Sequence, residues 1–193
     1  MKADKVLAWM TLFNDKIQAN KDYLSELDTP IGDGDHGGNM ARGMAAVMEE
    51  LAGKSYQQAS HIFKTVGMQL LSKVGGASGP LYGSAFIGMS KVADDERLVE
   101  CLQAGLEMII KRGKANPGEK TMVDVWTPVV ADLQAGLLKV EAIQAYAEKT
   151  KDLVASKGRA SYVGERSLGH LDPGAYSSAL LFQALVEVGG LDD

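Results

Sequence analysis

The sequence has little of what several protein classes require. Its single cysteine, Cys101, excludes an internal disulfide and a zinc site built from several cysteines. Acidic residues (25) outnumber lysine and arginine (20), which disfavours a nucleic-acid-binding protein because such proteins gather basic side chains on one face. No apolar run approaches the roughly 20 residues of a membrane-spanning helix. The first residues also lack a secretory signal pattern, so we expect a cytoplasmic protein with no membrane contact.

Residue patterns that favour β-strands are also scarce. Aromatic residues make up 6% of the chain, and no sustained period-two alternation of β-branched and aromatic residues is present. The 46% of hydrophobic and 23% of charged residues are nevertheless typical of a folded globular protein. At 193 residues, the chain has the length of one domain, and we predict a single domain over residues 1–193.

Apolar residues recur instead at three- and four-residue spacing, the pattern of amphipathic helices. Eight segments show this spacing: 4–27, 39–51, 56–74, 79–92, 96–114, 122–138, 140–157 and 174–188. Each would bury one face against its neighbours, as the stripe Leu102, Leu106 and Ile109 indicates. We therefore predict an all-α fold, an antiparallel up-and-down barrel of about eight helices.

Four connections are longer and richer in glycine, proline or aspartate than a turn requires. They are Asp28–Gly38, Gly75–Pro80, Ala115–Thr121 and Gly158–Pro173. These connections follow the first, third, fifth and seventh predicted helices. Because alternate loops of an up-and-down bundle share one end, we expect all four to meet at one rim, and we expect the functional residues there.

The first of these connections is strongly acidic. Asp28, Asp33 and Asp35 fall within eight residues, with no basic residue between Lys21 and Arg42. Such carboxylates repel one another unless a positive charge neutralises them. Oxygen ligands alone favour Mg²⁺ or Ca²⁺ over zinc, and the missing glutamate at the twelfth position of a calcium loop makes magnesium the better candidate. A solvated acidic loop is the alternative interpretation.

The same loop also contains a glycine pattern and a histidine. Gly32, Gly34 and Gly37 spell G-x-G-x-x-G, but a helical segment precedes them where dinucleotide-binding folds have a strand. We reject that motif.

His36 lies among carboxylates that would favour its charged form, and it could contact a phosphate, contact a partner or hold the loop.

The remaining connections suggest an anion site. Glycines precede Ser78 and Pro80 at a predicted helix start, where free backbone N–H groups can cradle a phosphate; a plain glycine-rich turn is the alternative. Arg159 and Arg166 could neutralise a polyphosphate or could simply be surface charges. Met122 could seat a nucleotide base.

Four ordered motifs carry a resemblance over essentially the whole chain. They are Gly32–Met40, Gly75–Gly83, Lys120–Asp124 and Gly158–Gly174. With them the sequence resembles the nucleotide-binding L subunits of bacterial, phosphoenolpyruvate-dependent dihydroxyacetone kinases. The resemblance implies an eight-helix barrel whose rim holds ADP or ATP through two Mg²⁺ ions.

The resemblance also implies residue roles. The metal ligands would be Asp28, Asp33 and Asp35. Nucleotide-binding residues would be His36, Asn39, Met40, Gly76, Ala77, Ser78, Gly79, Thr121, Met122, Arg166, Asp172 and Gly174. Within this set His36 and Arg166 would take part in catalysis, and Thr121 and Met122 would face the adenine.

The implied reaction is phosphoryl transfer from bound ATP to dihydroxyacetone, which a separate K subunit holds. A phosphohistidine of a third, M subunit would then rephosphorylate the bound ADP. We expect this stand-alone form because a chain of 193 residues has no room for the fused K-like and L-like domains of the ATP-consuming enzymes. An ATP-consuming domain for another acceptor protein, or a non-catalytic regulator on the same fold, are the alternatives. The chain could also form a homodimer.

Overall fold

The computed structural model describes residues 1–95 and 97–191, and every regular element within these ranges is a helix. The α-helices are α1 (Ala3–Asp28), α2 (His36–Leu51), α3 (Ala59–Lys73), α4 (Ser78–Ser90), α5 (Leu98–Gly113), α6 (Val123–Ala135), α7 (Val140–Glu148) and α8 (Pro173–Glu187). Two 3₁₀ helices, η1 (Lys149–Asp152) and η2 (Arg159–Ser167), lie between α7 and α8. The all-α prediction is confirmed.

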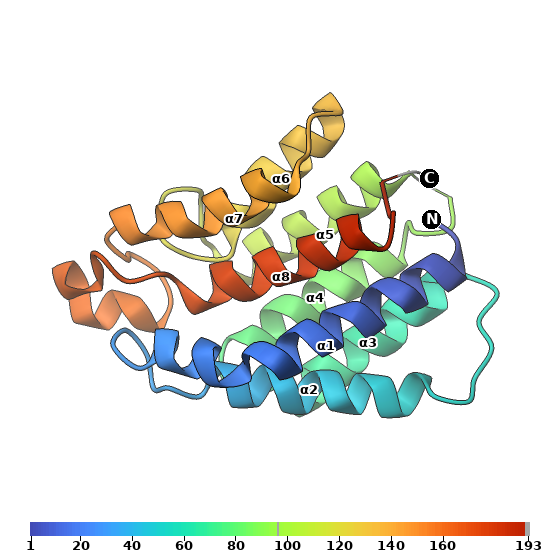
Figure 1. The fold of residues 1–193 in the computed structure, drawn as a ribbon, viewed down its shortest axis with the longest axis horizontal. Coiled ribbons are helices and arrows are strands. Elements are labelled where there is room, and N and C mark those ends of the chain that lie inside the picture. The colour runs from blue at the N-terminus through green and yellow to red at the C-terminus, as the bar shows by residue number, and fades with distance from the viewer. Residues whose placement is uncertain (96, 192–193) are drawn as a thin grey trace.

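The helices contact one another in a closed order. Each α-helix packs against the next along the chain, and α8 packs against α1 (Figure 1). This is the neighbour order of the up-and-down arrangement that the sequence predicts. No described helix combines the length and the apolar character that crossing a bilayer would take.

Aromatic side chains fill the interior between the helices. Trp9 of α1 packs edge-on against Phe63 of α3, with ring centroids 5.9 Å apart, and Trp126 of α6 packs in the same way against Phe182 of α8 at 4.9 Å. The Trp9 Nε1–H also donates to the Leu181 carbonyl at 2.8 Å. This buried hydrogen bond joins the first and the last helix.

Several helix boundaries differ from the predicted ones. Helix α2 begins at His36 rather than at residue 39, and residues 153–157 are not helical although the periodicity predicts a helix to residue 157. The chain leaves the helix there because tertiary partners take its amides: the Ala155 N–H donates to Ser167 Oγ at 2.8 Å. Part of the predicted last connection is helix η2. The predicted start of the fifth helix at Glu96 lies outside the described residues.

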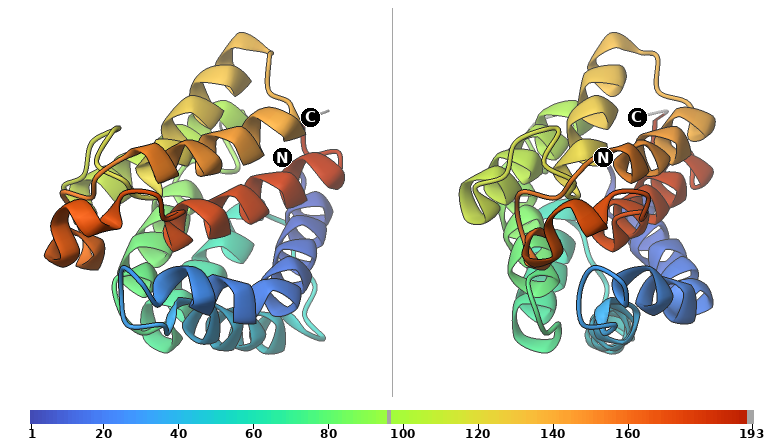
Figure 2. Two further views of the ribbon diagram at one scale, coloured as in Figure 1. Left: turned by 60° about the vertical axis from the view of Figure 1, so that its left-hand side comes forward. Right: turned by 90° about the vertical axis from the view of Figure 1, so that its left-hand side faces the viewer.

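The connections after α1, α3, α5 and α7 gather at one end of the molecule. Figure 1 shows the blue loop after α1 and the orange segment around η2 at the left-hand end, while both termini lie at the opposite end. Figure 2 (right) views the molecule from this loop end. The arrangement agrees with the shared rim predicted from the sequence.

Close contact between α1 and α2 sets the geometry of this rim. A Cβ atom on Gly37 would lie 1.7 Å from the carbonyl oxygen of Lys21, so α2 reaches its position only with glycine there. Neighbouring Gly38, in contrast, has no atom within 4 Å of such a Cβ.

These two glycines give a matched pair of variants. Gly37→Ala should destabilise the fold by about 1–3 kcal/mol, because the methyl group forces the backbones of α1 and α2 apart. Gly38→Ala should leave the fold as stable or more stable by up to about 1 kcal/mol, since alanine favours the helix. Urea unfolding measures both, and equal stabilities of the two variants would contradict the close approach.

Candidate functional site

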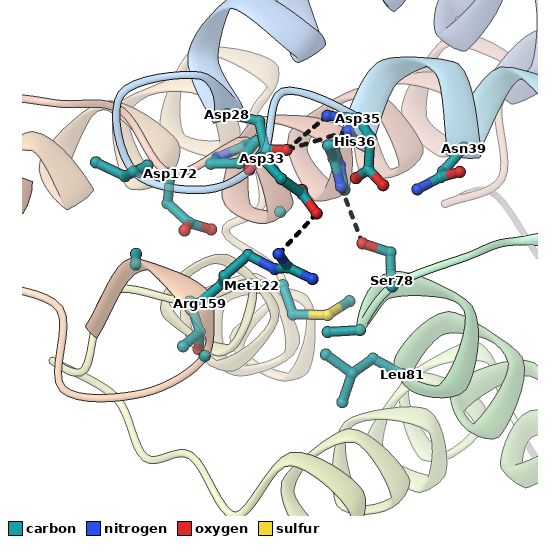
Figure 3. Close-up of a pocket in the computed structure, with 18 of the residues that line it drawn as sticks. Asp28, Asp33, Asp35, His36, Asn39, Ser78, Leu81, Met122, Arg159 and Asp172 are labelled. Atoms are coloured by element: carbon teal, nitrogen blue, oxygen red, sulfur yellow. Dashed lines mark hydrogen bonds and ion pairs between the residues drawn. The ribbon is translucent and has the colours of Figure 1, made fainter. Parts of the chain in front are cut away.

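A cavity of about 140 Å³ opens at the loop end of the molecule. All four predicted connections contribute to its wall, which confirms that they meet (Figure 3). The wall includes Asp28, Asp33, Asp35, His36, Asn39, Gly75, Gly76, Ala77, Ser78, Lys120, Thr121, Met122, Lys157, Gly158, Arg159, Asp172 and Gly174.

Three carboxylates lie at one side of the cavity. Asp28, Asp33 and Asp35 each place an oxygen so that the three atoms lie within 4.8 Å of one another. Asp28 is buried at the end of α1, and its Oδ2 accepts the backbone N–H groups of Asp35 at 3.0 Å and His36 at 3.2 Å. The Asp28 side chain therefore folds the acidic loop back and places the start of α2.

Burial raises the pKa of the Asp28 carboxyl group. The two backbone N–H donors oppose this shift, and the carboxylates of Asp33 and Asp35 add to it. A cation among the three carboxylates would relieve both the repulsion and the cost of burying the charge. An all-oxygen donor set of this kind fits a hard divalent ion such as Mg²⁺.

Arg159 of η2 reaches this cluster. Its Nη1 lies 2.8 Å from Asp33 Oδ2 (Figure 3), but both side chains are exposed, so the pair contributes less than about 1 kcal/mol to stability. Arg166, near the other end of η2, is exposed and does not line the cavity. The structure thus brings Arg159 to the predicted site and leaves Arg166 outside it.

His36 is buried between two serines. Its Nδ1 lies 2.9 Å from Ser78 Oγ and its Nε2 lies 3.0 Å from Ser177 Oγ. Burial lowers the pKa of the imidazole to about 4, so the ring is neutral near pH 7. The expectation that neighbouring carboxylates would favour the charged form is wrong, because burial removes the hydration that the charged ring needs.

The glycine-rich connection supplies backbone donors. Gly76 has a positive φ of 66°, a conformation that favours glycine, and the chain then enters α4 at Ser78. The first N–H groups of α4 have no partner within the helix, and the helix dipole places partial positive charge there. Ala77 and Ser78 line the cavity at this point, which suits an anion.

Two other predicted nucleotide-binding residues do not line the cavity. Met40 is fully buried in the main hydrophobic core. Gly79 lies inside α4, where a Cβ atom would come within 2.2 Å of the Val74 carbonyl oxygen. Gly79 therefore allows the close turn between α3 and α4, which positions the cavity residues Ala77 and Ser78.

A second cavity of about 260 Å³ adjoins the first and has a mostly apolar wall. Pro80, Ile109 and Val123 line it, and Leu81 and Met122 line both cavities. In Figure 3 the side chains of Leu81 and Met122 lie across the cavity from the carboxylates. The site therefore has a charged compartment and an apolar compartment side by side.

Two charged residues in the wall of the cavity are buried. The Asp172 carboxylate caps the start of α8 by accepting the Ala175 N–H at 2.8 Å. Lys120 is 1% exposed and has a left-handed backbone, with φ 62°. Lys120 belongs to one of the four motifs, yet no role was predicted for it, because a lone lysine in a loop is usually a solvated surface residue.

Comparison with known proteins identifies the family to which this chain belongs. The DAK2 domain model matches residues 30–187. The "PEP-dependent dihydroxyacetone kinase 1, ADP-binding subunit DhaL" of Listeria innocua is 54% identical over 189 residues, which cover 95% of this chain and 96% of that protein. The "PTS-dependent dihydroxyacetone kinase, ADP-binding subunit DhaL" of Lactococcus lactis is 56% identical over 186 residues, or 96% and 97%. This chain belongs to the DAK2 domain family.

A solved dihydroxyacetone kinase structure contains the same fold. The dihydroxyacetone kinase from C. freundii, crystallised in complex with AMP-PNP and Mg²⁺, matches with a TM-score of 0.78 and 28% identity. The match covers 94% of this chain and 33% of that chain. The present chain thus spans about a third of that kinase, whereas it spans nearly all of the two DhaL subunits.

The buried Asp172 gives a prediction about pH. Burial raises the pKa of this carboxyl group from its ordinary value of 3.8 to about 7 in the folded protein. Between these values Asp172 binds more protons in the folded state than in the unfolded state, so its contribution to stability falls as the pH rises from about 4 to 7. Asp172→Asn keeps a helix cap and removes this dependence.

We expect the stability of Asp172→Asn relative to the natural chain to increase with pH by up to about 1.4 kcal/mol per pH unit, and to level off above pH 7. Urea unfolding at pH 5, 6, 7 and 8 in EDTA measures the difference. The His36 contribution is the same in both proteins and cancels. A difference that stays constant over this range would show that Asp172 is ionised throughout.

Proposed function

We propose that this chain is the nucleotide-binding subunit of a phosphoenolpyruvate-dependent dihydroxyacetone kinase, a phosphotransferase active with partner subunits. The observation that carries the proposal is the pairing of a carboxylate cluster with a helix amino terminus in one cavity, next to an apolar cavity. The identity of more than half to relatives named as ADP-binding subunits, over nearly their whole length, supports it.

The two cavities match the two parts of a nucleotide. The phosphates of ADP or ATP would lie in the charged cavity, on the backbone of Gly76, Ala77 and Ser78. The base would enter the apolar cavity beside Thr121 and Met122, with the ribose between the two compartments. Asp172 and Gly174 would close the wall around the phosphates.

Asp28, Asp33 and Asp35 would hold the divalent cations, and two Mg²⁺ ions are the number that we propose. Bound Mg²⁺ would neutralise phosphate charge and orient the phosphoryl group for transfer. The solved relative in complex with AMP-PNP and Mg²⁺ supports the choice of metal. Without a cation, three clustered carboxylates would repel the phosphates.

The protein side chains then act by positioning and by neutralising charge, since phosphoryl transfer needs no protein nucleophile. Arg159 is the cation nearest to the carboxylate cluster in the cavity. His36 is neutral, with both ring nitrogens in hydrogen bonds to serines, so we assign it to holding Ser78 in place rather than to proton transfer. Arg166 remains a candidate for contact with the phosphates when a partner is bound.

The proposed partners are a K subunit that holds dihydroxyacetone and an M subunit whose phosphohistidine rephosphorylates the bound ADP. The names of the relatives describe ADP-binding subunits of PEP-dependent or PTS-dependent dihydroxyacetone kinases, which supports partner subunits of this kind. A homodimer and a cytoplasmic location stay predictions from the sequence.

Nucleotide retention tests the proposal. Native mass spectrometry of protein purified in Mg²⁺ should show near-stoichiometric ADP that survives dialysis and does not exchange with labelled ATP. Asp33→Ala and Asp35→Ala should lose the ADP and keep the fold, because both side chains are exposed and act through the cation. Asp22→Ala is the matched control, since Asp22 is an exposed acidic residue of α1 outside the cavity.

Each outcome decides between the hypotheses. ADP bound normally by the Asp33 and Asp35 variants would refute the metal assignment. Rapid exchange with ATP in the natural chain would favour an ATP-consuming kinase domain for another acceptor. Complete absence of nucleotide binding would favour a non-catalytic role.

We expect different effects from substituting the two arginines of η2. Arg159→Ala should weaken Mg·ADP binding by about tenfold, the effect of losing roughly 1.4 kcal/mol of charge-assisted contact. Arg166→Ala should leave binding to the isolated chain unchanged and slow transfer only in the system reconstituted with K and M subunits. Isothermal titration and a coupled transfer assay measure the two effects, and the reverse pattern would exchange the two roles.

A further inference from the structure

Residues near both ends of the segment between α7 and α8 meet at one side chain. The Lys120 Nζ donates to the Thr150 carbonyl oxygen at 2.5 Å and also to the His170 carbonyl oxygen. Residues 151–169, here called the strap, lie between these two acceptors. One ammonium group therefore ties the start of the strap to its end.

Other hydrogen bonds close the strap at the same place. The Gly169 N–H donates to the Lys151 carbonyl oxygen at 2.7 Å, and the Asp172 N–H donates to Thr150 Oγ1 at 3.0 Å. The ends thus form a narrow neck, as in the compact loops whose termini lie side by side. Lys120 comes from a different part of the chain, so it joins this neck to the connection before α6.

The strap is packed against the acidic loop. Ala155, Ala160 and Val163 of the strap contact Ile31 in a small hydrophobic cluster separate from the main core, and Ile31 is 2% exposed. Arg159 adds its ion pair to Asp33. The strap is therefore a structured wall of the cavity, attached on one side to the carboxylates and at its neck to Lys120.

The burial and the backbone conformation of Lys120 are both energetically unfavourable by themselves. A buried ammonium loses its hydration, and a left-handed backbone is unfavourable for a residue with a Cβ atom. Two carbonyl acceptors and the neighbouring charges of Asp172, Asp124 and Asp152 offset the burial. Lys114, which has the same left-handed backbone with φ 52°, is exposed at the end of α5.

We propose that Lys120 is a positioning residue for the nucleotide site: its ammonium fixes both ends of the strap and so holds Arg159 and Asp172 around the phosphates, which slows nucleotide release. This inference rests on the proposed nucleotide-binding function. Lys120 acts through the strap, so its loss should affect how long the nucleotide stays more than how fast it arrives.

The test compares Lys120→Met with Lys114→Met in the full chain. Both variants replace a lysine by methionine at a left-handed position, so the backbone cost and the charge change are matched. Lys120→Met should release Mg·ADP at least about tenfold faster, with little change in the association rate, and hydrogen exchange should rise in residues 151–169. Lys114→Met should keep the natural values for each quantity.

A purely structural role for Lys120 would give a different result. In that case Lys120→Met would lower the unfolding temperature, raise hydrogen exchange throughout the helices and leave the ADP release rate unchanged in the folded protein. That result would overturn the proposal. Association slowed as much as release is accelerated would also overturn it, because a strap that only retains bound nucleotide does not slow its arrival.

A measurement on the natural chain keeps the proposal testable if Lys120→Met does not fold. Without nucleotide, trypsin should cut after Arg159 and Arg166 in the strap more slowly than after Lys139 in the connection between α6 and α7. Preferential cutting in the strap would overturn the proposal. This measurement does not depend on ADP, so it separates a failure of the strap inference from a failure of the nucleotide-binding function.

Discussion

The repulsion among three carboxylates is the constraint on which the rest of the site depends. Asp28, Asp33 and Asp35 are held within 4.8 Å of one another, although like charges this close disfavour one another. The fold holds them there through the Asp28 side chain, which accepts two backbone N–H groups of the returning loop. A divalent cation completes this arrangement, and the adjacent start of α4 supplies positive potential for the phosphates that the cation would accompany.

Buried polar side chains lie next to this cluster, whereas most of the buried side chains in the described part of the chain are hydrophobic. His36 bridges Ser78 and Ser177, and the Tyr82 hydroxyl lies 2.7 Å from Ser177 Oγ, so hydrogen bonds run from the cavity wall into the core. Such buried groups need partners to avoid a large desolvation cost. Lys120 follows the same rule with carbonyl oxygens as its partners. These buried hydrogen bonds give the loops around the cavity fixed positions.

Much of this organisation could be predicted because it is encoded locally. Helical periodicity predicts the number and order of the helices, and their alternation predicts that four connections share one end. The carboxylates within eight residues predict a cation site, since their spacing alone creates the repulsion. Other features could not be predicted. The neutral state of His36 depends on its burial beside Ser78 and Ser177, which lie 42 and 141 positions away, and no local pattern shows that.

The sequence by itself therefore determined the fold class, the acidic cluster and the glycine-rich helix start, because each depends on neighbouring residues and on backbone chemistry. The tertiary structure alone decided which arginine faces the cavity: η2 turns Arg159 toward Asp33 and leaves Arg166 outside the cavity wall. It also decided that Lys120 is buried, since its acceptors come from residues 30 and 50 positions further along the chain. Long-range packing sets burial and direction, and these two properties determine what a charged side chain does.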